Sequence, residues 1–114
     1  MRLEDGIVSR PLRERDIEAN LVKCVKAIGG EVRKVAWTGR RGAPDRLVML
    51  PTKCLMPTID CAWCNPKGRA VWVELKAPGI KPPTYQLREH ARMRAMGQDV
   101  RVIDSIHAIE ELLA

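Results

Sequence analysis

The sequence lacks long apolar runs. Apolar residues make up 46% of its 114 residues and charged residues 30%, but no run approaches the roughly 18 apolar residues that a transmembrane helix needs. The opening stretch, MRLEDGIVSR, mixes acidic and basic residues and has no apolar core of the kind found in signal peptides. These absences argue against a membrane or exported protein, and we expect a cytoplasmic location with no membrane partner.

Cysteine is sparse, and repeats are absent. The four cysteines are Cys24, Cys54, Cys61 and Cys64. Without an export signal, a disulfide framework is not expected, because the cytosol keeps thiols reduced. The sequence has no internal repeat or low-complexity tail. A chain of this length is therefore expected to form one domain, residues 1–114.

Acidic residues are fewer than basic ones. The chain has 20 Lys and Arg against 14 Asp and Glu, which gives a formal net charge of +6 and a pI near 9.5. A positive charge favours a polyanionic partner, with nucleic acid as the first candidate. Because many small domains are modestly basic, charge alone does not decide the partner.

The pattern of apolar residues, prolines and glycines predicts a mixed sheet flanked by helices. In order, it predicts a helix at 11–28, strands at 31–37 and 45–50, an irregular insertion at 51–69, a strand at 70–75, a helix at 84–96, a strand at 100–103 and a helix at 105–114. The insertion has no sustained period and contains three prolines and three cysteines.

Helical spacing predicts which faces are buried. The first helix repeats apolar residues at Ile17, Leu21, Cys24 or Val25, and Ile28. In the helix at 84–96, the same reasoning places Leu87, Ala91 and Ala95 on one face. The C-terminal helix is expected to begin at a cap formed by Asp104 or Ser105.

Charged residues lie at the ends of two predicted strands: Asp45 where one strand begins, and Glu74 and Lys76 where another ends. Glu74 and Lys76 are two positions apart, so their side chains emerge on one face roughly 6.6 Å apart. An exposed ion pair is the ordinary explanation for such a pair. Asp45 follows a proline, where an Asp that accepts backbone hydrogen bonds in a turn is common.

A second interpretation joins these residues. If the two strands are neighbours, Asp45 and Glu74 bring two carboxylates to one edge of the sheet, where they repel unless a cation lies between them. Such hard oxygen ligands suit Mg²⁺ or Mn²⁺. Lys76 would then lie beside the metal, able to orient or activate a water and to offset charge on a phosphate.

The order Pro44-Asp45, then Glu74-Leu75-Lys76, resembles the PD-(D/E)xK nuclease superfamily. Four segments in order, GRRGAPDRLVMLP, VWVELKAPG, YQLREH and AMGQDVRVIDS, narrow this resemblance to the VRR-NUC branch, whose small members occur as stand-alone phage and bacterial proteins. The resemblance covers the chain from about Arg13 onward, apart from the insertion. It implies a restriction-endonuclease-like α/β core with a mixed central sheet, in a bacterial or phage-infected cell.

The resemblance also implies roles for the residues at the strand ends. Asp45 and Glu74 would be metal ligands together with the backbone carbonyl of Leu75, and Lys76 would be the catalytic lysine. Gln86 matches the family's glutamine and would point its amide toward the metal water or the scissile phosphate. A surface amide is the alternative for Gln86.

The family also places a glutamate on the first helix, facing the site. Glu14 and Glu18 both qualify, since they are four residues apart on one helical face. Glu18 is preferred, because Ile17 and Leu21 bury that side of the helix. An ordinary solvated acid is the alternative for each.

Several basic residues are candidates for DNA contact. The glycines of TGRRGAPD let the backbone approach a phosphate, and the candidates that could contact the DNA backbone are Arg40, Arg41, Lys81, Arg88 and Arg92. Each could instead be a solvated surface residue. His90 lies one turn after Gln86, and a structural role is preferred for it over a place in the site.

The insertion departs from the compact family pattern. Cys54, Cys61 and Cys64 offer three thiolates, and C-x-x-C is a spacing that zinc favours. No fourth ligand is nearby, and Cys24 is expected to be a core residue. Small apolar cysteines beside Trp63 are therefore preferred over a structural Zn²⁺ site.

Together these features predict a Mg²⁺- or Mn²⁺-dependent, structure-specific DNA endonuclease. Small family members resemble Holliday-junction resolvases, and a homodimer could make two symmetric cuts in branched DNA. One alternative is a non-catalytic DNA-binding module on a nuclease fold. Another is a general replication or repair nuclease that acts on other DNA structures. No sequence-reading module such as a helix-turn-helix is evident.

Overall fold

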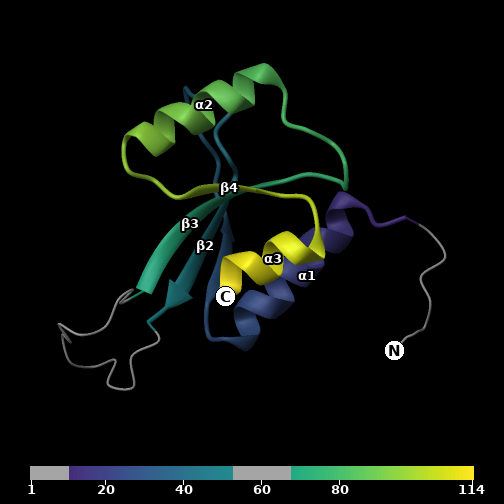
Figure 1. Ribbon diagram of the computed structural model, residues 1–114. Coiled ribbons are helices and arrows are strands. Elements are labelled where there is room, and N and C mark those ends of the chain that lie inside the picture. The colour runs from purple at the N-terminus through teal and green to yellow at the C-terminus, as the bar shows by residue number, and fades with distance from the viewer. Residues whose placement is uncertain (1–10, 53–67) are drawn as a thin grey trace.

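The computed structural model describes residues 11–52 and 68–114 (Figure 1). Its elements are α1 Glu14–Ala27, β1 Glu31–Lys34, β2 Arg46–Pro51, β3 Gly68–Leu75, α2 Thr84–Ala95, β4 Val100–Ile103 and α3 Ile106–Leu113. This is the order of helices and strands predicted from the sequence, although β1 ends three residues early. No helix within these two ranges is long and apolar enough to cross a membrane.

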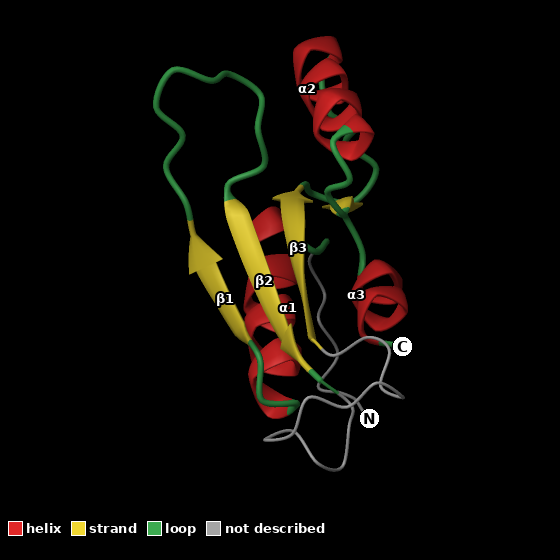
Figure 2. Ribbon diagram, turned by 90° about the vertical axis from the view of Figure 1, so that its left-hand side faces the viewer, coloured by secondary structure: helices red, strands yellow, loops and turns green. Residues whose placement is uncertain are grey.

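The four strands form one mixed sheet in the order β1-β2-β3-β4 (Figure 2). β1 and β3 both pair antiparallel with β2, and β4 pairs parallel with β3. The register places Arg46 opposite Val73, and Trp72 opposite Val100. The predicted α/β fold with a mixed central sheet and flanking helices is therefore confirmed.

Helices α1 and α3 cover one face of the sheet and contact each other (Figure 1). The core on this face is aliphatic: Ile17, Leu21, Val25, Val48, Leu50, Val71, Val73, Leu75, Ile103, Ile109 and Leu112. Cys24 is only partly buried, at the edge of this core, and Val25 is fully buried. The prediction that Ile28 is buried is wrong, because α1 ends at Ala27 and Ile28 is 47% exposed at its C-cap.

Helix α2 lies over the opposite face of the sheet (Figure 1). Its buried residues are Glu89, His90 and Met93. The prediction of an apolar face was wrong here, because Leu87 is 49% exposed and Ala91 and Ala95 are exposed as well. The apolar repeat points outward, because α2 contacts the rest of the molecule through charged and polar side chains.

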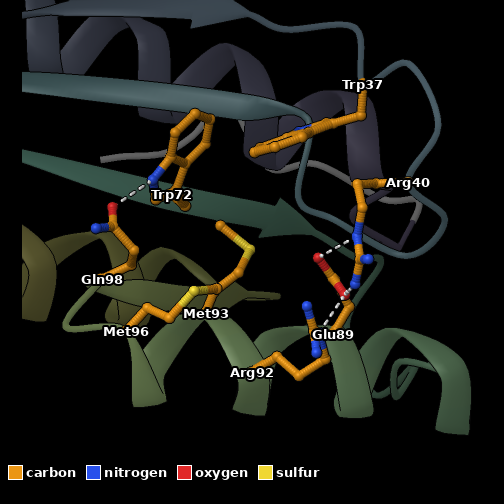
Figure 3. A pocket seen from close by; sticks show the side chains of 8 residues that line it. All are labelled: Trp37, Arg40, Trp72, Glu89, Arg92, Met93, Met96 and Gln98. Carbon is orange, nitrogen blue, oxygen red and sulfur yellow. Dashed lines mark hydrogen bonds and ion pairs between the residues drawn. The ribbon is translucent and has the colours of Figure 1, made fainter.

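Two tryptophans lie on the same side of the sheet as α2 (Figure 3). Trp72 alternates with the core residues Val71 and Val73 along β3, so it points away from α1 and α3. Its ring centroid is 5.1 Å from that of Trp37, with the planes tilted by 52°. The indole of Trp72 also donates to Gln98 Oε1 at 3.1 Å.

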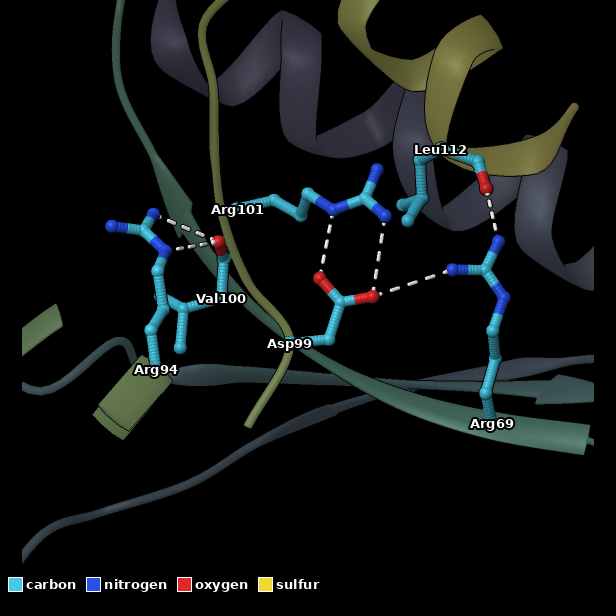
Figure 4. Close-up of polar contacts among 6 residues, drawn as sticks. All are labelled: Arg69, Arg94, Asp99, Val100, Arg101 and Leu112. Carbon is cyan, nitrogen blue, oxygen red and sulfur yellow. Dashed lines mark hydrogen bonds and ion pairs between the residues drawn. The ribbon is translucent and has the colours of Figure 1, made fainter. Parts of the chain in front are cut away.

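Arginine side chains tie the last elements to the sheet (Figure 4). Arg69 of β3 bonds the carbonyl of Leu112 in α3 and pairs with Asp99. Arg101 of β4 donates to the same carboxylate at 2.7 Å. Arg94, near the end of α2, donates to the carbonyl of Val100 at 2.8 Å. These bonds hold both helices against the β3–β4 pair.

The N-terminus of α3 is capped by a side chain. Ser105 Oγ accepts a hydrogen bond from the amide of Ala108 at 3.0 Å. Of the two residues predicted as the cap, Ser105 is therefore the one that makes the capping bond.

Candidate functional site

The end of the β2–β3 pair brings the two predicted acids together. Because Arg46 pairs with Val73 in an antiparallel register, Asp45 and Glu74 lie next to each other at the same end of the sheet. The expectation that these strands are neighbours is confirmed. Burial raises the pKa of Glu74, and the negative charge of Asp45 adds to this shift.

The turn that carries Asp45 is held on both sides. Pro44 is fully buried, and its carbonyl accepts a hydrogen bond from the Trp37 indole at 2.7 Å. The carbonyl of Asp45 accepts from the amide of Val35 at 2.9 Å. The Asp45 side chain stays 51% exposed. The backbone is thus fixed, while the carboxylate remains accessible to a ligand.

Glu74 and Lys76 form an ion pair with 3.3 Å between Oε2 and Nζ. The ordinary explanation, an exposed pair, does not hold, because the two side chains are only 12% and 15% exposed. Burial raises the pKa of Glu74 above its usual value. The Lys76 ammonium opposes this shift, and the negative charges of Asp45 and Glu14 add to it. Glu74 is therefore a buried carboxylate that lacks full charge compensation.

The two candidate acids on α1 have different neighbours. Glu18 accepts a hydrogen bond from Arg46 Nε at 2.7 Å, and the same guanidinium contacts Asp45 Oδ1 at 2.9 Å. Glu14 makes its contribution through its charge, which acts on Glu74. Arg46 thus links Glu18 to Asp45. The preference for Glu18 over Glu14 as a metal ligand stays a prediction.

Sequence reasoning missed Arg46. Only 9% of this residue is exposed, and it pairs with both Glu18 and Asp45. The sequence does show a charged residue at the first position of β2, and the register places this residue opposite the buried Val73. A buried arginine needs carboxylate partners, because an unpaired charge in that position is strongly unfavourable.

Gln86, at the start of α2, is not a surface amide. The residue is half-buried, and its Oε1 atom is buried with no hydrogen-bond partner in the structure. The loop before Asp45 reaches this part of α2 at Gly42, where an added Cβ would lie 2.9 Å from the Tyr85 carbonyl and 3.3 Å from Gln86 Cα. Gly42 therefore permits a close contact between the loop and α2.

The donor set at this end of the sheet fits a hard divalent cation. Asp45 and Glu74 supply carboxylate oxygens, and the unpartnered Gln86 Oε1 is a further oxygen on the α2 side. A cation would also offset the charge that raises the Glu74 pKa. Within residues 11–52 and 68–114, no three His, Cys, Asp or Glu converge as a metal-holding group. Two carboxylates with a backbone carbonyl and waters match the way Mg²⁺ usually binds.

His90 is fully buried, and neither of its ring nitrogens has a partner in the structure. Burial lowers its pKa, and the positive charges of Arg94 and Lys76 lower it further against the opposing effect of Glu89. A neutral imidazole is therefore favoured. His90 packs in the layer between α2 and the sheet, near enough to Lys76 for their charges to interact.

The basic residues predicted to contact DNA fall into three groups. Arg40 and Arg92 both pair with Glu89, whose carboxylate is 8% exposed. Arg41 lies over the ring of Tyr85 at 4.0 Å from its centroid. Lys81 and Arg88 are exposed on or before α2, and each could meet a phosphate. None of these five contacts with DNA is established by the geometry.

The candidate zinc ligands Cys54, Cys61 and Cys64 lie outside the described residues, as does Trp63. Cys24 is partly buried against the aliphatic core, and its Sγ is 3.7 Å from Asn20 Oδ1. It therefore packs at the edge of the core rather than inside it, and the predicted core role is confirmed only in part.

Comparisons with known proteins point in one direction. No family model matches the chain. It is 48% identical over 96 residues to "Putative nuclease p44" of Acyrthosiphon pisum secondary endosymbiont phage 1, across 84% of this chain and 87% of the phage protein. A solved structure described as "VRR_NUC domain" has a TM-score of 0.67 at 35% identity and covers 88% of this chain and 92% of its own. Both similarities span nearly the whole chain rather than one motif.

Proposed function

This chain belongs to the VRR-NUC family of nucleases, and on that premise we propose that it is a metal-dependent, structure-specific DNA endonuclease. The observation that carries the proposal is the buried Glu74 carboxylate beside Asp45 and Lys76 at one end of the sheet. An ion pair that only stabilised the fold would not need Asp45. Asp45 places a second negative charge close to Glu74, whose carboxylate is already desolvated, and this makes the charged form of Glu74 less favourable.

Asp45 and Glu74 would hold one Mg²⁺ or Mn²⁺ together with the carbonyl of Leu75. Such an ion, when bound, lowers the pKa of a water ligand and offsets negative charge on the phosphate. Lys76 would donate from Nζ to the attacking water or to a phosphate oxygen, since its ion pair with Glu74 keeps it at the site. Gln86 would orient the phosphate from the α2 side. Hydrolysis would then proceed by direct attack of water on phosphorus: a new P–O bond forms while the ester bond to one sugar oxygen breaks, the attacking water loses a proton, and the leaving sugar oxygen takes up a proton to become a hydroxyl.

The contribution of α1 separates into two candidate roles. Glu18 is bonded to Arg46, which also contacts Asp45, so its nearest role is to position Asp45. Glu14 is the alternative metal ligand on α1, since its negative charge also acts on Glu74. Glu14→Gln and Glu18→Gln distinguish the two candidates, because the variant that weakens metal binding more identifies the ligand.

We further propose that branched DNA is the substrate and that a homodimer makes the two cuts. A two-fold dimer places one site on each strand of a junction. The outer face of α2 supports this proposal, because Leu87 is 49% exposed there beside the exposed Ala91 and Ala95. A chain that stays monomeric in solution at the working concentration would count against junction resolution but not against simpler nuclease activity.

The first test is cleavage of labelled four-way-junction, flap, single-stranded and linear duplex DNA with Mg²⁺ or Mn²⁺. Paired nicks at the junction are expected from the wild type, and Glu74→Ala and Lys76→Ala should both lose them. Cleavage that prefers flap or single-stranded DNA would support a replication or repair nuclease with a different substrate. Binding without cleavage by the wild type, with either metal, would favour the non-catalytic module.

A further inference from the structure

Aromatic residues gather on the α2 side of the sheet. The chain has no Phe, one Tyr and three Trp, and the aliphatic core contains none of the three aromatic residues that the structure describes. Trp37 and Trp72 form a tilted pair, and Tyr85 stacks under Arg41. Large apolar side chains contribute most to stability inside a core. Their placement outside it points to a binding role.

The tryptophan pair lines a pocket of about 350 Å³ between the sheet and α2 (Figure 3). We call it the tryptophan pocket and define it by Trp37, Trp72, Met93, Met96, Arg40 and Arg92. The rings form one wall and the methionines of α2 face them (Figure 3). Its size is at the lower end of the range for small-molecule sites.

Charge at one end of the tryptophan pocket is positive. Arg40 and Arg92 both pair with the single carboxylate of Glu89, which leaves one excess positive charge. The two arginine side chains stay 44% and 60% exposed, so they can contact a second anion. A flat heteroaromatic ring that carries a phosphate suits this pocket. The ring could stack on the tryptophans and contact the polarizable methionines, and the phosphate could pair with the two exposed guanidinium groups.

The tryptophan pocket adjoins the proposed nuclease site through two elements. Arg40 belongs to the loop that leads to Asp45, and Trp37 holds that loop through the Pro44 carbonyl. On α2, Met93 follows Gln86 by about two turns, or roughly 10 Å along the axis. A nucleotide next to the bond to be cut can therefore reach the pocket. A paired base cannot enter, because it is stacked inside its duplex.

We propose that the tryptophan pocket binds one unpaired nucleobase of the DNA substrate, with its phosphate at Arg40 and Arg92. This inference rests on the proposed function for the presence of DNA. It deepens that function by naming how a branched or distorted strand is distinguished from plain duplex. Stacking on the tryptophan wall supplies affinity without reading the base sequence, since every base has an aromatic face.

The test measures binding of the full chain to three short DNAs with EDTA present, so that no cleavage occurs. One duplex carries a single bulged deoxyadenosine, the second carries a bulged abasic nucleotide, and the third is fully paired. The wild type should bind the bulged deoxyadenosine about tenfold more tightly than the other two, because stacking of one base is worth that much or more. Equal affinity for the bulged base and the abasic nucleotide would overturn the pocket.

Two variants test whether the preference for the bulged base depends on the tryptophan pocket. Trp72→Leu keeps apolar bulk but removes the aromatic face, and Met96→Glu places a negative charge where the residue is 63% exposed. Both should abolish the preference for the bulged base and leave affinity for paired duplex within about twofold. The matched control is Ile28→Glu, at the exposed C-cap of α1, which should keep the preference. A preference that survives both pocket variants would overturn the proposal, even if Trp72→Leu alone failed to fold.

The outcomes separate this inference from the proposed function. Metal-dependent cleavage without a preference for the bulged base would overturn the pocket and leave the nuclease intact. A preference for the bulged base without cleavage would support the pocket and contradict the nuclease. A wild-type chain that neither binds nor cuts DNA would contradict both.

Discussion

The two faces of the sheet bury different kinds of side chain. Under α1 and α3 the core is aliphatic, and Ile17, Leu21 and Val25 repeat at helical spacing against the strands. Under α2 the buried residues include Glu74, Glu89 and His90. The first face removes apolar surface from water, which is the main favourable contribution to folding. The second keeps charged and polar groups away from water, which is unfavourable unless they are paired.

On the proposed function, the aliphatic core under α1 and α3 provides stability, and the α2 face, together with the acids of α1, serves the reaction. The aliphatic face can maintain the sheet while the other holds a carboxylate with a raised pKa and a neutral histidine without partners. Groups with perturbed pKa values gather at functional sites for the same reason. Substitutions on the two faces should therefore move stability and activity in different ways.

The largest effect is expected at Asp45. Asp45→Asn removes one of the two carboxylates at this end of the sheet, and we expect cleavage to fall by at least about 10³-fold, since the metal's contribution is worth several kcal/mol. The loss of stability should be small, because the side chain is 51% exposed and Arg46 keeps Glu18 as a partner. Initial cleavage rates and thermal melting with and without Mn²⁺ measure the two quantities. The melting temperature of the wild type should rise with Mn²⁺, and that of the variant should not.

The matched control for Asp45→Asn is Glu31→Gln. Glu31 is an exposed strand acid paired with Arg33, on β1 and away from the site. It should cleave like the wild type and keep the Mn²⁺ effect. An Asp45→Asn protein that cuts DNA at the wild-type rate would show that the charged end of the sheet is structural.

The contrast between the faces also explains which elements could be predicted. Periodicity located α1 and its buried residues Ile17 and Leu21, and gave Val25 as an alternative to Cys24, because an aliphatic core imposes helical spacing on the sequence. The same method chose Leu87 on α2, where the buried residues are Glu89, His90 and Met93. A hydrophobic pattern does not identify a helix face on which two of the three buried residues are polar.

The candidate site shows the same limit. Asp45, Glu74 and Lys76 could be chosen from the sequence, because a residue motif marks them and the strand register brings the two acids together. Arg46 was missed, because the sequence shows its charge at the start of β2 but not the partners that give it a role, Glu18 and Asp45. The tryptophan pocket was missed for a similar reason, since Trp37 and Trp72 are far apart in sequence and meet only in the folded chain.

The second effect should appear on the aliphatic face. Val25→Ala removes two methyl groups from a fully buried position, and we expect unfolding free energy to fall by about 2 kcal/mol. Val22, on the same helix, is 39% exposed, and Val22→Ala should change stability by no more than about 0.5 kcal/mol. Urea unfolding measures both. Equal losses of unfolding free energy in the two variants would contradict the burial of Val25 in the core.

The third effect concerns two glycines of the loop before Asp45. Gly42 and Gly39 both have positive φ, at +89° and +76°, so Ala in either place should cost about 1 kcal/mol. Only at Gly42 would the new Cβ meet Tyr85 and Gln86, while nothing lies within 4 Å at Gly39. Gly42→Ala should therefore lose more stability, and it should also lower the cleavage rate by displacing Gln86.

The comparison of Gly42→Ala with Gly39→Ala isolates the contact between the loop and α2. Urea unfolding gives the stability difference, and cleavage rates at saturating metal show whether Gln86 has moved. If both variants cut DNA equally well, the close approach of the loop to α2 has no part in catalysis.

The smallest effect should be a gain in stability. Burial raises the pKa of Glu74 despite the attraction of Lys76, so the folded chain binds this proton more tightly than the unfolded chain does. By linkage, the contribution of Glu74 to stability falls as pH rises from the ordinary carboxyl pKa, about 4.3, through the raised folded value. Glu74→Gln has no such proton, and it should be more stable than the wild type at pH 7 by about 1 kcal/mol.

The pH dependence of this difference makes the test specific to Glu74. Carboxylates that do not interact with Glu74 cancel when the variant is compared with the wild type at each pH, so the advantage of Glu74→Gln should grow as pH rises above the ordinary carboxyl value of about 4.3. Urea unfolding across this range measures it in the absence of divalent metal. A variant that is less stable than the wild type at pH 7 would mean that Lys76 outweighs burial. Glu74 would then belong with the groups that stabilise the fold, and the functional contrast between the two faces would lose its main support.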